Sequence, residues 1–313
     1  MNPVTYLAEP SEHALRSALR QVAPALAVGG IDLSIRPQNA PLMHRRGSAI
    51  LDGAFVVKFA WSEVAARSIV QEARILRALA DRDLPLPRPL VITSSPALLI
   101  YRRIEGVPLT WERACALPAD SVGRLAGALA RLMAGLHAST GAMRSGGLRL
   151  GPPEAQCDGT RIRRDLLPRL NGRRAAWVKA LAGRVEETLA GPGAEPVLLH
   201  GDFHGWNFVL DPPLDSVAGL LDLEGAAIGD YHFDFRYLPA QDATLTLLHL
   251  VTQEYQRETG RRVSLERVLA WHVLTDLGDA LWRTEQGVEV VAGPLPRRVD
   301  GLRRRLATAG LDW

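Results

Sequence analysis

The stretch LLHGDFHGWNFVLD, residues 198–211, decides the fold, because it places a polar constellation between two short apolar runs. It contains His200, Asp202 and Asn207 in the spacing H-x-D-x-x-x-x-N. Each polar side chain stands close to the end of a predicted buried strand, which is typical of residues that point into a cleft rather than into solvent. The stretch therefore predicts a functional site.

A second carboxylate follows 15 residues after Asn207, where Asp222 ends the apolar run of GLLDLEG, residues 219–225. Phosphoryl transfer requires an oriented acceptor hydroxyl, a group that accepts its proton, and metal ions that neutralise charge on the phosphate oxygens. Mg²⁺ prefers hard oxygen ligands, usually one or two carboxylates together with substrate phosphates. One Asp for the hydroxyl, with an Asn and a second Asp for the metal, meets these needs.

Two other interpretations of these residues stay open. Asp and Asn are common in turns, so each of them alone is explained by a turn. A metal hydrolase is a further alternative, with His200, His204, Asp202 and Asp222 as candidate ligands. That alternative gives no role to Asn207 or to the first hundred or so residues.

The motif resembles the catalytic loop of the aminoglycoside phosphotransferase family, a branch of the protein-kinase-like fold. The similarity extends to GDYHFDF at 229–235 and to LLIYRRIEGVPL at 98–109. The resemblance implies an α+β, bilobal fold with a small N-terminal antiparallel-sheet lobe and a larger, mainly helical C-terminal lobe. It further implies Mg²⁺ and either ATP or GTP as co-substrate.

The resemblance also implies roles for individual residues. Asp202 is expected to be the catalytic base, and Asn207 and Asp222 the Mg²⁺ ligands, with His200 supporting the loop. Backbone groups of the hinge segment are expected to meet the adenine, at Arg102, Arg103 and Ile104.

The order of predicted elements agrees with two lobes, at residues 1–105 and 106–313. The first is expected to bind nucleotide and the second to hold the catalytic and acceptor sites. Short strands are predicted at Leu33–Arg36, Ser48–Leu51, Phe55–Ala60, Pro89–Thr93, Leu98–Arg103, Val197–Leu199, Phe208–Leu210 and Ala218–Leu221. Apolar periodicity predicts helices at 11–22, 62–80 and 119–138, and mostly helix toward the C-terminus.

Lys58 is one of only two lysines among 37 basic residues and ends the run FVVK. A lysine at this place in kinases reaches the nucleotide phosphates and is held by a Glu of the following helix. Glu72 is the candidate, because it projects from the apolar stripe of helix 62–80, where an ionised carboxylate needs a cation. The alternative is that Glu72 lies at the edge of the stripe and reaches water.

The loop between the first two strands departs from protein kinases. QNAPLMHRRGS, residues 38–48, has Gly47 as its only glycine. Arg45 and Arg46 are therefore either phosphate-binding charges or solvated side chains.

The acceptor is expected to be a small hydroxylated molecule of the aminoglycoside antibiotic type, which would make the protein a resistance enzyme. Asp276, Asp279 and Trp282 fall on nearly one side of a helix, and two acids beside an aromatic ring suit a polycationic amino sugar. Trp206 is a further candidate at the acceptor entrance. Macrolide-like antibiotics and hydroxylated metabolites are alternatives, as is a solvated helix edge for the two acids.

Composition limits the other classes of function. The 313 residues are 47% hydrophobic and 23% charged, with a formal net charge of +3, which is ordinary for a soluble protein. The basic residues are scattered and form no nucleic-acid-binding motif, so no nucleic-acid partner is expected. No apolar run is long enough to span a membrane. The presence of only two cysteines favours a reducing cytoplasm. A monomer and a homodimer are both compatible with the sequence, and a catalytically silent nucleotide-binding scaffold is the alternative from another class.

Overall fold

The computed structural model describes residues 3–35, 41–155, 157–212, 214–242, 244–287, 294–311 and 313. Contacts group the chain into two compact units. Unit 1 comprises Met1–Gly106, Gly141–Arg149 and Ala218–Ala226, and unit 2 comprises Val107–Thr140, Leu150–Val217 and Ala227–Trp313. Two later segments of the chain therefore pack with its N-terminal part, so a single boundary along the sequence does not separate the two units.

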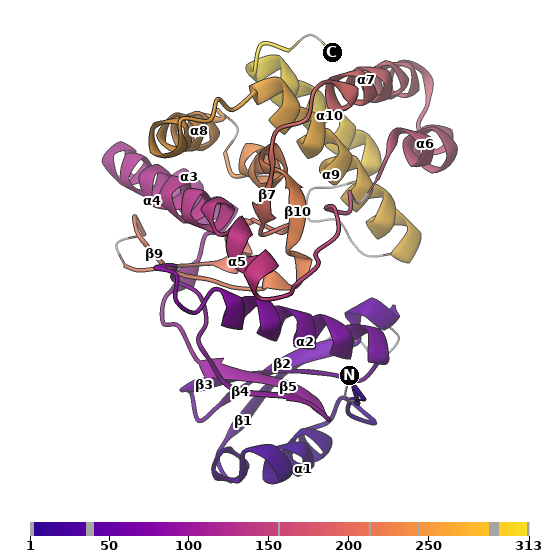
Figure 1. Ribbon diagram of the computed structural model, residues 1–313. Coiled ribbons are helices and arrows are strands. Elements are labelled where there is room, and N and C mark those ends of the chain that lie inside the picture. Colours follow the sequence, from indigo (N-terminus) through magenta and orange to yellow (C-terminus); the bar gives the residue numbers. More distant parts are fainter. Residues whose placement is uncertain are drawn as a thin grey trace. The chain divides into compact units, whose positions relative to one another are not determined.

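Unit 1 is built on an antiparallel sheet of five strands in the order β1-β2-β3-β5-β4. Its strands are β1 (Ile31–Ile35), β2 (Arg46–Leu51), β3 (Phe55–Ala60), β4 (Pro89–Ser94) and β5 (Ala97–Arg102). Helix α1 (Glu12–Val22) lies on one face of this sheet and helix α2 (Glu63–Ala78) on the other (Figure 1). Both helices begin at a serine whose hydroxyl accepts from a backbone N–H of the first turn.

The alternation of side chains along β3 decides which groups face which helix. Val57 and Phe59 are fully buried in the core between the sheet and α1, together with Leu15 and Leu19 of that helix. Since successive side chains of a strand point to opposite faces, Lys58 projects toward α2. The sheet thus places the one lysine of unit 1 on the face that α2 covers.

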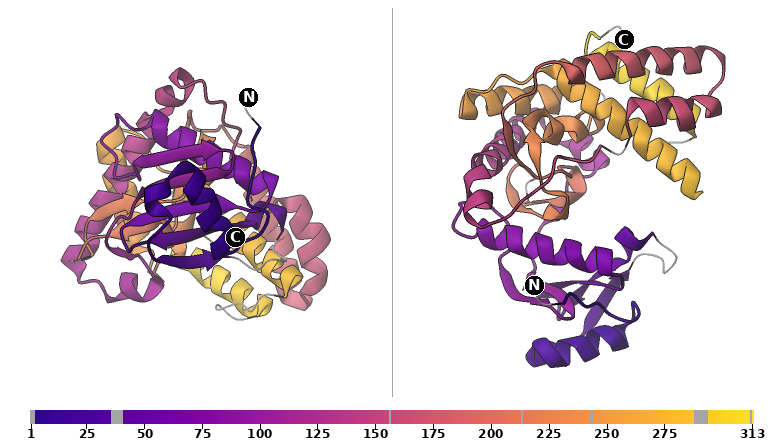
Figure 2. Two further views of the ribbon diagram at one scale, coloured as in Figure 1. Left: turned by 90° about the horizontal axis from the view of Figure 1, so that it is seen from below. Right: turned by 45° about the vertical axis from the view of Figure 1, so that its right-hand side comes forward.

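Unit 2 is mainly helical. Its longer helices are α4 (Ala119–Ala138), α7 (Gly172–Ala190), α8 (Thr246–Thr259), α9 (Leu265–Gln286) and α10 (Leu295–Thr308). The core between α7, α9 and α10 contains Val178, Leu181, Val273, Leu277 and Leu302, and Figure 2 shows these helices side by side.

Short elements carry the polar loops. The remaining strands are β6 (Val107–Pro108), β7 (Pro196–Leu199), β8 (Phe208–Leu210), β9 (Val217–Leu220) and β10 (Ala227–Asp230). The short helices within the described residues are α3 (Trp111–Ala116), α5 (Thr140–Ser145), α6 (Gly159–Arg161), η1 (Pro24–Leu26), η2 (Leu42–His44), η3 (Ile162–Leu166), η4 (Leu167–Arg169), η5 (Gly205–Asn207), η6 (Leu223–Gly225) and η7 (Tyr231–Ala240). β7 pairs antiparallel with β10, and β6 with β8.

The predicted α+β architecture is confirmed. Every predicted strand is present with shifts of a few residues at its ends, although Arg36, the last residue of the first one, lies outside the described residues. β6 and β10 were not predicted. None of the helices within the described ranges combines the length and apolarity that a membrane span requires.

Candidate active site

The loop between β7 and β8 in unit 2 carries the predicted catalytic residues. Gly201 has a φ of 78°, a left-handed conformation that glycine adopts without strain, and it turns the chain out of β7. His200 is fully buried, and its Nδ1 accepts from the backbone N–H of Asp202 at 3.2 Å. His200 therefore supports the loop, as the resemblance implied.

Asp234 of η7 anchors the start of this loop. Its carboxylate accepts from the backbone N–H groups of His200 at 2.8 Å and Gly201 at 2.9 Å, and from His137 at 3.2 Å. Burial acts to raise the pKa of Asp234, but the hydrogen bond and charge of His137 outweigh it and the pKa is lowered. A fully buried, ionised group thus fixes the backbone just before Asp202.

Asp202 itself is held ionised. Burial acts to raise its pKa, but the hydrogen bond from His204, with the charge of Arg236, lowers the pKa well below the ordinary value. His204 Nδ1 accepts from the Trp206 N–H at 3.2 Å, so its Nε2 carries the proton and donates to Asp202 at 3.3 Å. Nδ2 of Asn207 donates to the Asp202 carbonyl at 2.8 Å. Asp202 is therefore ionised at neutral pH.

A cavity of about 380 Å³ opens beside this carboxylate, entirely within unit 2. The residues that matter for its chemistry are Asp202, Tyr237, Asp276, Asp279, Arg283 and Arg298. Ligand pockets typically range from about 300 to 1,000 Å³, so a small molecule fits here. The predicted acids Asp276 and Asp279 thus share a cavity with the predicted base.

The two aromatic candidates for the acceptor side lie elsewhere. Trp206 is 68% exposed at the surface of the loop, and half-buried Trp282 is not among the described residues that line the cavity. Tyr237, which sequence reasoning missed, does line it, and burial raises its pKa so that its hydroxyl stays protonated. Tyr237 is recognised as a cavity-lining residue from the position of η7 in the fold, and no sequence pattern singles it out.

Unit 1 holds the nucleotide-side candidates. The Lys58 ammonium donates to both carboxylate oxygens of Glu72 at 2.8 Å and also to Asp222. Glu72 is 0% exposed, so it points to the lysine and not to water. Burial acts to lower the pKa of Lys58, but the charges of Glu72 and Asp222 hold it well above the ordinary value. Lys58 therefore stays charged at the centre of two carboxylates.

Glu224, two residues after Asp222, is a further charged group that the sequence did not single out. It forms an ion pair with Arg46 of β2, so this arginine is not simply solvated. Burial and the charge of Asp222 raise the pKa of Glu224 to about 7, against the opposing charges of Arg46 and Lys58. The segment after β9 thus contributes two carboxylates to unit 1.

The segment predicted to meet the adenine follows β5. Arg102 ends that strand, and the N–H of Arg103 donates to Ala54 at 2.9 Å. Ile104 packs against the backbone of Gly219, where an added Cβ would lie 2.7 Å from the Ile104 Cδ1. The position of Ile104 therefore depends on glycine in β9.

The residues expected to hold Mg²⁺ have the right donor chemistry. Because Nδ2 of Asn207 turns to Asp202, the Asn207 side-chain oxygen is the atom left for a cation, and Asp222 offers a carboxylate. Asn207 lies in unit 2 and Asp222 in unit 1, so their joint use stays a prediction. Among the described residues, no group of three or more His, Cys, Asp or Glu side chains is placed to hold a metal ion.

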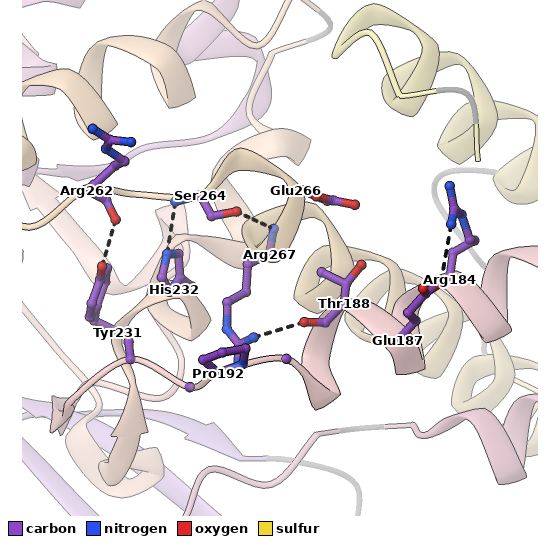
Figure 3. A pocket seen from close by; sticks show the side chains of 13 residues that line it. Arg184, Glu187, Thr188, Pro192, Tyr231, His232, Arg262, Ser264, Glu266 and Arg267 are labelled. Carbon is purple, nitrogen blue, oxygen red and sulfur yellow. Dashed lines mark hydrogen bonds and ion pairs between the residues drawn. The ribbon is translucent and has the colours of Figure 1, made fainter.

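A larger cavity of about 540 Å³ in unit 2 contains none of the predicted site residues (Figure 3). Its polar groups bind one another: Tyr231 donates to the Arg262 carbonyl, Ser264 N–H to His232, and Arg267 to the Thr188 carbonyl. We therefore place the candidate active site at Asp202.

The fold and these two groups of residues define a kinase-like phosphotransferase. The chain belongs to the phosphotransferase enzyme family, whose model matches residues 46–271, so the predicted family is confirmed. Among curated proteins, none matches the chain in sequence.

Solved structures share the fold. The GDP complex of aminoglycoside 2'-phosphotransferase-IIIa superposes with a TM-score of 0.71 at 17% identity, over 96% of this chain and 99% of that one. The streptomycin–ATP–APH(2")-IIa ternary complex gives 0.58 at 16%, over 91% and 96%. Macrolide 2'-phosphotransferase MphH from Brachybacterium faecium gives 0.56 at 22%, over 94% and 98%.

Proposed function

We propose that this protein transfers the γ-phosphoryl group of ATP or GTP to a hydroxyl group of a small molecule, with Asp202 as the base. The observation that carries the proposal is the ionised Asp202 carboxylate on a cavity large enough for a small acceptor. Family membership and the anchoring of its loop by Asp234 support it.

In the proposed reaction the acceptor hydroxyl oxygen forms a bond to the γ-phosphorus while the bond from that phosphorus to the β,γ-bridging oxygen breaks. Asp202 orients the hydroxyl and accepts its proton, which then leaves to solvent. The products are a phosphate monoester and a nucleoside diphosphate. The low pKa of Asp202 suits orientation and late proton transfer rather than early deprotonation.

On the nucleotide side, Lys58 would bind the phosphates, with Glu72 holding its ammonium in place. Backbone groups of Arg102, Arg103 and Ile104 would meet the base. Solved neighbours are complexes with GDP and with ATP, so the sequence prediction of either nucleotide stands as part of the proposal.

Asn207 and Asp222 would hold Mg²⁺ together with the substrate phosphates. When bound, the cation would neutralise charge that develops on the phosphate oxygens during transfer. The role of this chain's residues is to present one amide oxygen and one carboxylate oxygen. Lys58, bonded to Asp222, would keep that carboxylate oriented.

The class of acceptor is less restricted by these residues. The sequence favoured an aminoglycoside because of Asp276 and Asp279, and the neighbours' printed names include both aminoglycoside and macrolide phosphotransferases. Fold similarity at this identity does not transfer a substrate. The charges around the two acids bear on this choice.

Replacing Asp202 with Asn tests the proposal. We expect Asp202→Asn to reduce the rate of phosphoryl transfer by about a thousandfold or more, within the range of general base catalysis, while nucleotide affinity is retained. Asp300→Asn, which removes an exposed carboxylate paired with Arg174, is the matched control. Unchanged transfer by Asp202→Asn would refute the assignment of the base.

A further inference from the structure

The two acids of the cavity at Asp202 are bound by arginines of the protein itself. Asp276 accepts from Arg298 at 2.8 Å and from Arg305 at 3.1 Å, one contact on each carboxylate oxygen. Asp279 accepts from Nε of Arg283 at 3.0 Å and from Arg298 at 2.7 Å. Both acids are therefore occupied by cations before any acceptor arrives.

The pair of Arg298 and Asp276 is the most deeply buried of these ion pairs. Arg298 is only 8% exposed and bridges both acids. Burial acts to raise the pKa of Asp276, but the charges of Arg305 and Arg298 lower it. An acceptor ammonium that displaced Arg298 from these acids would leave a buried guanidinium without its partners, which is costly.

His272 contacts the same cluster of charged side chains. Its Nδ1 donates to the Arg236 carbonyl and its Nε2 accepts from Arg305, so the imidazole is neutral. Burial, and then the charge of Arg305, lower the pKa of His272 to about 4. Asp276 and Asp279 are thus matched by three guanidinium groups, those of Arg283, Arg298 and Arg305, of which the first two line the cavity.

Of the two arginines in the described cavity lining, Arg283 is the one whose terminal nitrogens are not bonded to described residues. It lines the cavity and its side chain is 33% exposed. Only its Nε is bonded to Asp279, and no described residue accepts from its two terminal nitrogens. A guanidinium group fixed in this way presents its terminal donors as a fork, which matches a carboxylate.

On the basis of the proposed function, we infer that the acceptor is a hydroxylated acid rather than a polyamine, and that Arg283 determines this specificity by binding the acceptor's carboxylate. Asp276 and Asp279 then have a positioning role: they hold Arg283 and Arg298 and do not bind cations of the substrate. Asp202 remains the one carboxylate of the described lining that is directed to the hydroxyl.

The test is transfer to matched acceptors that differ in one group. A library of hydroxylated compounds is arranged in sets of three, each with a carboxylate, a hydroxyl or an amine at one end, such as gluconate, glucitol and glucamine. With wild-type protein, Mg²⁺ and ATP or GTP, we expect the highest kcat/KM for a carboxylate-bearing member. Preference for an amine-bearing or a neutral member would overturn the inference while leaving the proposed function intact.

Variants of Arg283 test whether this residue causes the preference for a carboxylate-bearing acceptor. Arg283→Gln should raise the KM for the preferred acid at least tenfold without changing the KM for nucleotide, and Arg283→Lys should recover part of the loss. Arg67→Gln removes another helical i,i+4 arginine–acid pair, Arg67–Glu63, outside the cavity, and should leave both KM values unchanged. An unchanged KM in Arg283→Gln would overturn the assignment. Transfer to no member of any set would count against the proposed function, and the inference would fall with it.

Discussion

At the scale of single residues, the candidate site depends on charges that the fold keeps ionised despite burial. Lys58 is held between Glu72 and Asp222, and the Asp202 loop is held by Asp234. The sequence predicted the Lys58–Glu72 pair because a rare lysine and a carboxylate on an apolar stripe need each other. It did not predict Glu224 or Arg283, because their partners and neighbours are set by tertiary packing and not by spacing along the chain.

Glu72 should matter to nucleotide binding through Lys58. We expect Glu72→Gln to weaken nucleotide affinity about tenfold, equivalent to ~1.4 kcal/mol, because the ammonium would then be drawn to Asp222 alone. Nucleotide titration by calorimetry measures this. Glu63→Gln alters an exposed carboxylate of the same helix and should have no effect; equal losses in the two variants would contradict the role of the pair.

Asp234 should make stability dependent on pH. Because the pKa of this carboxyl is lower in the folded state than the value of about 3.9 for an unfolded chain, its ionised form stabilises the fold above that value. The contribution is lost as pH falls through the folded pKa. We expect Asp234→Asn to lower the free energy of unfolding by about 3 kcal/mol at pH 7.

The difference between Asp234→Asn and the wild type should become smaller below about pH 4. Denaturant unfolding at pH 7 and in acid measures both differences. A difference that is the same at both pH values would show that the charge of Asp234 contributes nothing.

At the scale of elements, periodicity located the regular structure well. The predicted helix at 62–80 is α2 at Glu63–Ala78, since Ser62 caps it and its apolar stripe packs on the sheet. β10 was missed because AIGD shows no alternation and includes a glycine, and the strand exists through its pairing with β7. A strand that is stabilised mainly by pairing with a distant strand shows no clear strand pattern in its own sequence.

The contact between β9 and the segment after β5 gives a prediction at this scale. A side chain at Gly219 would press on Ile104, so we expect Gly219→Val to displace the segment Arg102–Ile104 and weaken nucleotide affinity at least tenfold. Gly123→Ala is the control, because an added Cβ there meets nothing within 4 Å. Nucleotide affinity that is unchanged in Gly219→Val would show that this segment does not meet the base.

For the whole molecule, the proposal requires groups from unit 1 and unit 2 to act on one nucleotide. The sequence assigned Asn207 and Asp222 to one metal through their donor chemistry and the family resemblance, because no spacing rule connects residues of separate units. Binding that involves both units stabilises the folded state by mass action.

Nucleotide and Mg²⁺ together should therefore raise the melting temperature. At a nucleotide concentration about 100-fold above Kd, the expected stabilisation is about 2.7 kcal/mol, a shift of several degrees. Removing Mg²⁺ with a chelator should reverse most of the shift, and Asp222→Asn should make the shift insensitive to the chelator. A shift that does not depend on Mg²⁺ in the wild type would contradict the metal assignment.

The most direct test of the central claim is the mass of the reaction products. Protein, Mg²⁺ and ATP or GTP are incubated with a library of hydroxylated compounds and analysed by mass spectrometry. The account predicts that a compound gains one HPO₃ unit while an equal amount of nucleoside diphosphate appears, and that neither change occurs with Asp202→Asn. A compound phosphorylated equally well by Asp202→Asn, or nucleotide hydrolysis with no phosphorylated compound across the library, would contradict it.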